Sequence, residues 1–323
     1  MLHRCMFSNI FRKTFRNLTM DKSQGPAPDA QLETFVVQPT SAHTHTIILL
    51  HGLGSNGEKF GTELLESGVS SAGMKLTEIY PGAKFVFPTA KKRRSSAFHR
   101  AKLNQWFDIA SLDDPSHRRD VQLQGLAESA LEIRGILNRE LVTIPNSNII
   151  FGGLSQGCAM SLSILLTLEF PLGGFVGMSG WLPFRRDIYD IINSNKTPDD
   201  EGVEDIFSFG GSEEEEVLDP SVAAINFVRD LLCIDALDIS TLKNAQMSLT
   251  TPVFLAHGED DEKIKVTLGQ EAAQTLSSIG IQTTWKSYPG LGHWYKIPEE
   301  IDDILEFLQL RLAQGASNGT EGV

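Results

Sequence analysis

The chain has 323 residues, a length between that of one large domain and that of two ordinary domains. Hydrophobic residues make up 41% of it and charged residues 21%, which is enough apolar material for a sizeable core and excludes a chain disordered throughout. The formal charge is −13, so a nucleic acid is not an expected partner, because its phosphates would be repelled. No apolar run approaches the roughly 20 residues of a membrane-spanning helix, which argues against an integral membrane protein.

The chain holds three cysteines, Cys5, Cys158 and Cys233, without regular spacing. An odd number in no repeating pattern gives neither a disulfide framework nor a zinc-type ligand set, so we expect a reducing compartment and no metal. The sequence also lacks a phosphate-binding glycine loop and a dinucleotide fingerprint, and we therefore expect no cofactor.

Residues 1–30 are predicted to be a disordered basic leader that ends in a Pro/Gly/Ser linker. Four apolar side chains recur there on one helical face: Phe7, Phe11, Phe15 and Leu18. Besides a flexible leader ahead of a second possible start at Met20, such a stretch is typical of a mitochondrial presequence or a helix at a membrane surface. No secretory signal peptide is visible, and a cytoplasmic location is expected.

Strands and helices alternate from residue 31 to residue 314, which predicts a single α/β domain ahead of a flexible tail at 315–323. The predicted strands are Phe35–Val37, Thr46–His51, Lys84–Pro88, Asn148–Gly152, Gly174–Ser179, Pro252–His257 and Thr283–Tyr288. The predicted helices are Asp120–Leu141, Cys158–Glu169, Val266–Ile279 and Pro298–Leu312. Several strands are continuous apolar runs, which suit a mostly parallel sheet covered by helices on both faces.

An acidic insertion at 185–250 interrupts this alternation, because an ordinary strand-to-helix connection is far shorter. It carries five basic and fifteen acidic residues, and its first half, Asn193–Leu218, is predicted to be solvated. In its second half, Asp219 and Pro220 mark a helix start, and apolar residues follow at helical spacing: Val222, Ile225, Val228 and Leu232. We expect a surface insertion with one helix packed on the body; a lid or docking element near the active site is the alternative.

The strongest chemical signal is the pentad Gly153–Gly157, which reads GLSQG. It lies between a predicted strand and a predicted helix, the context that a G-x-S-x-G nucleophile elbow requires. The two glycines leave room for the strained strand-to-helix turn that carries the serine. The pattern predicts Ser155 as a catalytic nucleophile.

A serine hydroxyl needs a base, and in α/β-hydrolases the chain order is serine, acid, histidine. His293 follows the last predicted strand in a glycine-rich loop and is the predicted base, whereas His257 ends a strand and is expected to pack. The turn after the preceding strand offers Asp261, which we select as the acid, with Asp260 as the second choice.

An oxyanion hole needs two backbone N–H donors. One is expected from Gln156, the residue after the nucleophile, and the other from Leu53 in the His51-Gly-Leu-Gly loop that follows an earlier strand. His51 precedes the elbow in the chain and is expected to be structural.

Six motifs occur together in one order and spacing. They are His51-Gly-Leu-Gly54, Trp106-Phe-Asp108, Gly152–Gly157, Ser179-Gly-Trp-Leu-Pro183, the His257-Gly258…Asp261 turn and Gly290-Leu-Gly-His293. Together they resemble the phospholipase/carboxylesterase family that contains the acyl-protein thioesterases. The resemblance covers roughly residues 46–184 and 251–312, and it implies an α/β-hydrolase fold with a sheet of about seven strands.

The resemblance also implies functional roles. Ser155, Asp261 and His293 match the family's triad, Leu53 and Gln156 its oxyanion donors. Trp181 and Leu182 match residues near the acyl-binding region, and Trp106 is expected among the substrate-binding residues. The implied enzymes remove palmitoyl groups from cysteine thioesters and act on lysophospholipids and short esters.

The chain departs from the family pattern at two places in the site. Cys158 stands where the family usually has glycine or alanine, and Ile264-Lys265 replaces a Val-Pro pair after the acid. Separately, six basic residues without an acid lie within 91–102, where a solvated loop is expected; a nuclear-localisation signal or docking to an anionic membrane is the alternative.

The sequence thus predicts a serine thioesterase/carboxylesterase that works through an acyl-enzyme on S-acylated proteins. A general carboxylesterase or lysophospholipase is the alternative within enzymes, because a triad does not specify the leaving group. A catalytically silent binding module is the alternative outside enzymes. Contact with a membrane is expected to be peripheral at most, and the oligomeric state is left open.

Overall fold

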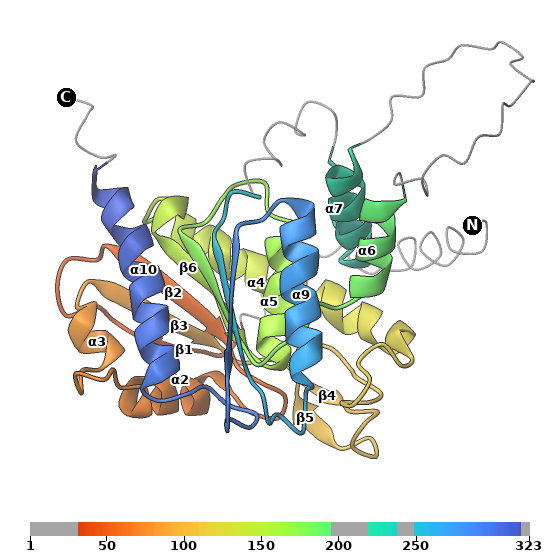
Figure 1. Cartoon of the computed structure of the whole chain (residues 1–323), viewed down its shortest axis with the longest axis horizontal. Helices are drawn as coiled ribbons and strands as arrows, with labels where there is room; N and C mark the ends of the chain where they lie inside the picture. Colours follow the sequence, from red (N-terminus) through yellow and green to blue (C-terminus); the bar gives the residue numbers. More distant parts are fainter. Residues whose placement is uncertain (1–31, 195–218, 238–248, 318–323) are drawn as a thin grey trace, which may run out of the picture.

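The computed structural model describes residues 32–194, 219–237 and 249–317, and its centre is a seven-stranded sheet (Figure 1). The strands run in the order β1-β3-β2-β6-β7-β8-β9 across the sheet. Their bounds are β1 Thr34–Val37, β2 His45–Leu50, β3 Ala83–Pro88, β6 Ile149–Leu154, β7 Gly174–Met178, β8 Val253–Gly258 and β9 Thr283–Tyr288. All neighbouring pairs are parallel except β1 with β3. The predicted α/β class and the seven strands are confirmed.

Helices cover both faces of the sheet (Figure 1). One layer contains α4 Leu123–Leu141, α5 Gln156–Leu165 and α9 Val266–Ile279, with α6 and α7 outside it. The other layer contains α2 Gly57–Ser67 and α10 Glu299–Ser317, with the short α3 Leu76–Ile79 beside them. In the described residues no helix combines the length and the apolar composition that crossing a membrane requires.

Two hydrophobic cores result, one on each face of the sheet. The central strands β2 and β6 have buried side chains at nearly every position, as their continuous apolar runs predict. Alternate strand residues point to opposite faces, so Ile48 packs in the core under α4 and α5 and Ile47 in the core under α2 and α10. This rigid frame aligns the carboxyl ends of the parallel strands at one edge, where α/β proteins place their ligands.

Residues 91–102 differ from the expected solvated loop. They form most of a small antiparallel hairpin, β4 Lys92–Arg94 and β5 Lys102–Asn104. Lys91 and Arg93 are bound to the α4 carboxylates of Glu132 and Glu128. These strands have only three residues each and no alternation of apolar and polar side chains, so the sequence did not predict them.

The acidic insertion contributes two helices to the described structure: α6 Arg185–Asn193 and α7 Pro220–Leu231, which pack against each other. The predicted helix α7 is present and its predicted apolar residues are buried, with Val228 and Leu232 packed in the core under α4 and α5. Helix α6 was not predicted. The remaining acidic part, 195–218, lies outside the described residues, as do the leader at 1–31 and the tail from 318. Helix α10 continues to Ser317, three residues into the predicted tail.

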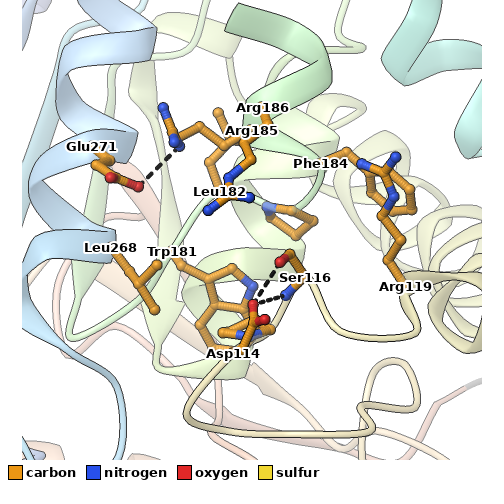
Figure 2. A pocket seen from close by; sticks show the side chains of 12 residues that line it. Asp114, Ser116, Arg119, Trp181, Leu182, Phe184, Arg185, Arg186, Leu268 and Glu271 are labelled. Atoms are coloured by element: carbon orange, nitrogen blue, oxygen red, sulfur yellow. Dashed lines mark hydrogen bonds and ion pairs between the residues drawn. The ribbon is translucent and has the colours of Figure 1, made fainter.

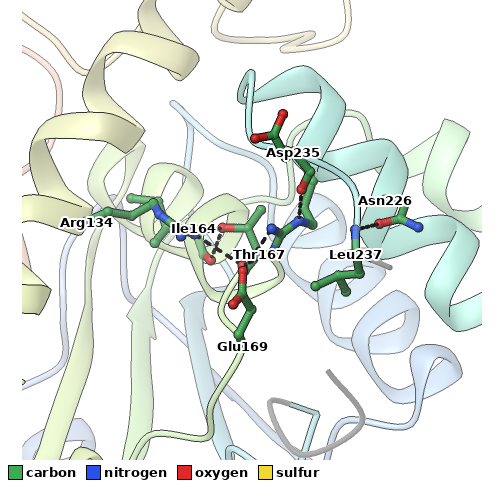
Figure 3. Close-up of polar contacts among 8 residues, drawn as sticks. Arg134, Ile164, Thr167, Glu169, Asn226, Asp235 and Leu237 are labelled. Carbon is green, nitrogen blue, oxygen red and sulfur yellow. Dashed lines mark hydrogen bonds and ion pairs between the residues drawn. The ribbon is translucent and has the colours of Figure 1, made fainter. Parts of the chain in front are cut away.

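A buried arginine fastens α7 to the loop that follows α5. Arg229 is 4% exposed and donates to the Thr167 carbonyl and the Glu169 carboxylate, each at 2.9 Å, and to the Asp235 carbonyl at 2.6 Å. Arg134 of α4 donates to the same Thr167 carbonyl at 3.2 Å (Figure 3). Because a buried guanidinium must be paired and hydrogen-bonded to be stable, these contacts hold α7 in its place on the domain.

Candidate active site

Ser155 occupies the turn between β6 and α5 with an unusual backbone conformation. Its φ is 57° and its ψ −121°, a region that costs a non-glycine residue free energy and is found mostly at functional sites. The Ser155 N–H donates to the Met178 carbonyl of β7 at 2.8 Å, which holds the turn in place. The residue lies at the carboxyl edge of the sheet and is 7% exposed.

The glycines of the pentad are required by close backbone contacts. A Cβ on Gly157 would lie 2.1 Å from the Leu50 carbonyl oxygen of β2, and one on Gly153 would lie 2.6 Å from the same atom. No larger residue fits at either position without moving β2 or the turn. The turn thus runs so close to β2 that glycine is required two residues before and two residues after Ser155, which explains the spacing G-x-S-x-G.

His293 and Asp261 meet Ser155 from the loops after the two adjacent strands β9 and β8. The His293 Nε2 lies 2.8 Å from the Ser155 Oγ, and the His293 Nδ1 lies 2.7 Å from the Asp261 Oδ2. The three side chains thus form one hydrogen-bonded chain across 138 residues of sequence. Asp260 is exposed, and its N–H bonds the Leu291 carbonyl, so its side chain is not part of this chain.

The Asp261 carboxyl is held by donors on both oxygens. Its Oδ1 accepts from the backbone N–H groups of Lys263 at 2.8 Å and Ile264 at 2.9 Å, while Oδ2 faces the histidines His293 and His257. Burial alone raises the pKa of Asp261, but hydrogen bonds from His257, His293 and the Ile264 N–H outweigh it and hold the pKa well below its usual value. The carboxyl is therefore ionised at neutral pH.

The two expected oxyanion donors flank the serine. Gln156 begins α5 directly after Ser155, and Leu53 lies in the loop after β2. That loop is close, because a Cβ on Gly52 would stand 3.8 Å from the Ser155 Oγ. Within the described part of the chain, neither the Leu53 N–H nor the Gln156 N–H donates a hydrogen bond.

A buried framework supports this loop. His51 has its Nδ1 2.7 Å from the Gly52 carbonyl and accepts at Nε2 from the Ala90 N–H at 3.0 Å. Burial lowers the pKa of His51 to about 4, so the ring is neutral and shapes the loop as predicted. The Trp106 indole N–H donates to the His51 carbonyl at 2.8 Å, and the Trp106 N–H donates to the Gln156 side chain at 3.0 Å.

A groove of ≈ 590 Å³ opens in front of Ser155 and His293. Its other lining residues are mostly apolar: Gly52, Leu53, Ser55, Phe60, Phe98, Leu103, Leu112, Leu154, Lys263, Ile264 and Trp294. Leu103 comes from β5 of the hairpin, and Phe98 comes from its turn. Sequence reasoning missed this wall, since nothing in a basic segment indicates that Phe98 and Leu103 face a groove.

The three predicted substrate-contacting residues do not line this groove. Trp181 and Leu182 line a separate cavity of ≈ 80 Å³, between α9 and the segment around Ser116 (Figure 2). Arg185 and Glu271 pair at its edge with 3.1 Å between nitrogen and oxygen. Trp106 has no exposed surface and lines neither of these two spaces in the described residues, and its hydrogen bonds to the His51 carbonyl and the Gln156 side chain support the Leu53 loop; its contact with substrate stays a prediction.

Cys158 is fully buried directly behind the serine turn. Its Sγ would lie 2.5–2.6 Å from a Cβ on Gly180 or Gly177, so those two glycines provide the space for the sulfur. Burial raises the pKa of the Cys158 thiol, which keeps it protonated and unreactive, and the expected packing role fits this position. In the described ranges, no group of three or more His, Cys, Asp or Glu side chains is arranged to hold a metal ion.

Comparison with known proteins gives relatives along most of the chain. The acyl-protein thioesterase 1 of Gibberella zeae is 27% identical over 285 residues, covering 87% of this chain and 97% of that protein. The acyl-protein thioesterase 1 of Yarrowia lipolytica is 28% identical over 272 residues, covering 83% and 92%. Among solved structures, acyl-protein thioesterase 2 of Zea mays superposes with a TM-score of 0.59 at 25% identity, covering 87% of this chain and 99% of that one.

The fold is that of the α/β-hydrolases. SOBER1 of Arabidopsis thaliana, with a TM-score of 0.58 at 22% identity, covers 83% of this chain and 99% of its own. The sequence pattern of the phospholipase/carboxylesterase family matches residues 32–199 and 233–312, which leaves out the whole of helix α7. The expected resemblance is confirmed, and the chain belongs to the phospholipase/carboxylesterase family, a family of carboxylesterases and thioesterases.

Proposed function

We propose that this protein is a serine hydrolase that cleaves fatty-acyl thioesters of S-acylated proteins, and carboxylic esters, through an acyl-enzyme. The observation that carries the proposal is the hydrogen-bonded chain from Ser155 through His293 to Asp261, which opens into an apolar groove. The names of the relatives support the thioester as the bond and an acylated protein as the substrate.

The acylation step follows from the proton positions. Because Asp261 is ionised, it accepts from His293 Nδ1–H, which leaves His293 Nε2 free to take the Ser155 hydroxyl proton. The Ser155 Oγ attacks the acyl carbon, and the oxyanion that forms is stabilised by the N–H groups of Leu53 and Gln156. When the intermediate collapses, the bond to the leaving sulfur or oxygen breaks, and that atom takes the proton from His293.

Deacylation repeats the sequence with water. His293 removes a proton from a water molecule as its oxygen attacks the acyl carbon, and then returns the proton to the Ser155 Oγ. The products are a fatty acid and the free serine. The positive end of the α5 helix dipole behind Ser155 favours the negative charge at each oxyanion stage.

The groove suits the acyl chain of the substrate. Its walls include Phe60, Leu112, Ile264 and Trp294, which provide apolar contact on several sides of the reacting serine. Burying an acyl chain gains roughly 0.8 kcal/mol for each methylene removed from water, so long acyl groups bind better than short ones.

The first test of the proposal replaces the nucleophile. Ser155→Ala should reduce kcat on a butyrate ester by about 10⁴-fold or more with an unchanged melting temperature, since the groups of a triad act as a unit. Ser71→Ala, at an exposed serine away from the site, is the matched control and should behave as wild type. Labelling by a fluorophosphonate probe should occur on Ser155 and disappear in the alanine variant.

The second test separates the leaving groups. Wild-type rates are compared on a palmitoyl-cysteine peptide, the same peptide with palmitoyl-serine, and a lysophospholipid. A higher kcat/KM for the thioester peptide supports depalmitoylation, whereas preference for the lysophospholipid identifies a lysophospholipase. Activity retained in folded Ser155→Ala, or a wild type without labelling and turnover, would overturn the proposal in favour of another nucleophile or a binding module.

A further inference from the structure

A second histidine, His257, contacts the same carboxylate oxygen as His293. It lies near the end of β8, and its side chain has no exposed surface. Its Nε2 is 3.1 Å from the Asp261 Oδ2 and 2.8 Å from the Ile264 carbonyl oxygen. The sequence predicted only packing for this residue, so its place beside the Asp261 carboxyl is a new observation.

These contacts determine which ring nitrogen of His257 carries a proton. A backbone carbonyl oxygen accepts hydrogen bonds and cannot donate them, so the contact with Ile264 requires a proton on Nε2. In the described residues the Nδ1 of His257 has no hydrogen-bond partner. His257 therefore acts as a donor at Nε2 and directs its N–H between the Ile264 carbonyl and Asp261.

Packing fixes the orientation of the His257 ring. A Cβ on Gly269 of α9 would lie 2.5 Å from the His257 Nδ1, so the glycine gives the ring its space on that side. The Trp285 ring of β9 packs against His257 with 6.3 Å between centroids. Since a helix and a strand enclose the ring, the Nε2 cannot turn away from Asp261.

We propose that His257 is a positioning residue for the hydrolytic reaction: its Nε2–H fixes the Asp261 Oδ2 at the point where His293 Nδ1–H meets it. The inference rests on the proposed function. Backbone N–H groups hold Oδ1, but among the described residues His257 and His293 provide the contacts of Oδ2. Without His257, the carboxylate can twist about its Cβ–Cγ bond, and His293 loses its fixed tautomer and orientation.

Glutamine and asparagine at position 257 each carry an amide N–H donor, but at different distances from the backbone. The side-chain nitrogen of glutamine reaches the position of a histidine Nε2, whereas that of asparagine reaches only the position of Nδ1, where His257 has no partner. His257→Gln should therefore retain kcat on a butyrate ester within about 3-fold. His257→Asn should lose kcat by roughly 10- to 100-fold with KM within about 2-fold, the range for a hydrogen bond to a charged group.

The pH profile distinguishes positioning from general loss of structure. The acid limb of kcat/KM reports the coupled Asp261–His293 pair. When the Asp261 carboxylate can twist away from His293, the ion pair that favours the protonated histidine weakens, so the acid limb of His257→Asn should move to lower pH. The limb of His257→Gln should stay at the wild-type position.

A third variant, Gly269→Ala, displaces the His257 ring without changing a group that touches Asp261. It should reproduce the loss of kcat and the moved acid limb. It also provides the test if His257→Asn does not fold, as judged by melting temperature. Wild-type kcat and pH profile in folded His257→Asn or Gly269→Ala would overturn the role of His257, as would equal losses in His257→Asn and His257→Gln. A wild type that hydrolyses no ester would instead contradict the proposed function.

Discussion

At the residue scale, the two neighbouring acids Asp260 and Asp261 differ only in their surroundings. Asp261 is 7% exposed and accepts from His293, while Asp260 faces solvent. Asp261→Asn should lower kcat by up to about 10⁴-fold with little change in KM, because an amide cannot hold the His293 tautomer that accepts from serine. Asp260→Asn should leave kcat within about 2-fold.

Steady-state rates on one ester, with melting temperatures for both variants, check this ranking. Because the two substitutions are adjacent and chemically identical, a difference in kcat reports the role of the carboxyl and not the loss of a charge. A larger loss for Asp260→Asn than for Asp261→Asn would move the acid role to Asp260.

The residues of the hydrogen-bonded chain could be selected from sequence because each has a local signal. Ser155 has glycines two positions away on both sides, and Asp261 and His293 follow strands in the expected chain order. His257 has no such signal, since the sequence of an apolar strand does not show whether its histidine only packs or also donates a hydrogen bond to a catalytic group. Trp106 poses a related difficulty: a motif shows that a residue matters, but it does not show whether that residue touches substrate or supports a loop.

At the scale of elements, the β4–β5 hairpin supplies one wall of the groove through Leu103, which lies between the exposed Lys102 and the half-buried Asn104. Leu103→Asn should lower kcat/KM for a decanoate ester about 10-fold, because the amide places a polar group against the acyl chain. The acetate ester barely reaches this wall, so its kcat/KM should change by less than about 2-fold.

Leu103→Met is the matched control, since it keeps an apolar side chain of similar volume. The ratio of the decanoate to the acetate kcat/KM measures the effect independently of enzyme concentration. An unchanged ratio in Leu103→Asn would show that the acyl chain lies along another part of the groove.

The length of an element did not decide whether it was predicted. The helix Val266–Ile279 and the strand Thr283–Tyr288 match their predicted bounds, because their patterns and end signals are clear. Helix α2 was missed, since its glycines at 57 and 61 weaken the helical pattern. Those glycines are needed for close packing: a Cβ on Gly57 would lie 1.9 Å from the Phe87 carbonyl oxygen of β3. In α2, close packing against β3 therefore outweighs the low helix propensity of glycine.

At the scale of the whole molecule, the alternation of strands and helices was enough to predict a mostly parallel sheet, because each apolar strand needs cover on both faces. It did not predict that β1 is antiparallel or how α6 and α7 lie on the body. Those features depend on contacts between distant segments, such as the one between Arg229 and Thr167.

The global stability should also depend on pH through Glu300 in the first turn of α10. Glu300 is 1% exposed, and its carboxyl accepts from the Lys296 N–H at 2.8 Å. Burial raises the pKa of Glu300 to about 8, the Lys296 N–H lowers it in part, and the negative charge of Asp303 raises it further. The folded state therefore binds a proton more tightly than the unfolded chain, so this contribution to the free energy of unfolding falls as pH rises from about 4.5 through about 8.

Unfolding in urea at pH 7 and pH 9 measures the effect. The depressed pKa values of His51 and Asp261 change stability only at lower pH, so they add no slope in this range. Wild type should lose on the order of 1 kcal/mol between the two pH values. Glu300→Gln should lose less and be the more stable protein at pH 9, whereas Glu299→Gln, which removes the same charge from an exposed neighbour, should keep the wild-type slope. Equal slopes in wild type and Glu300→Gln would show that the Glu300 carboxyl does not take up a proton on folding.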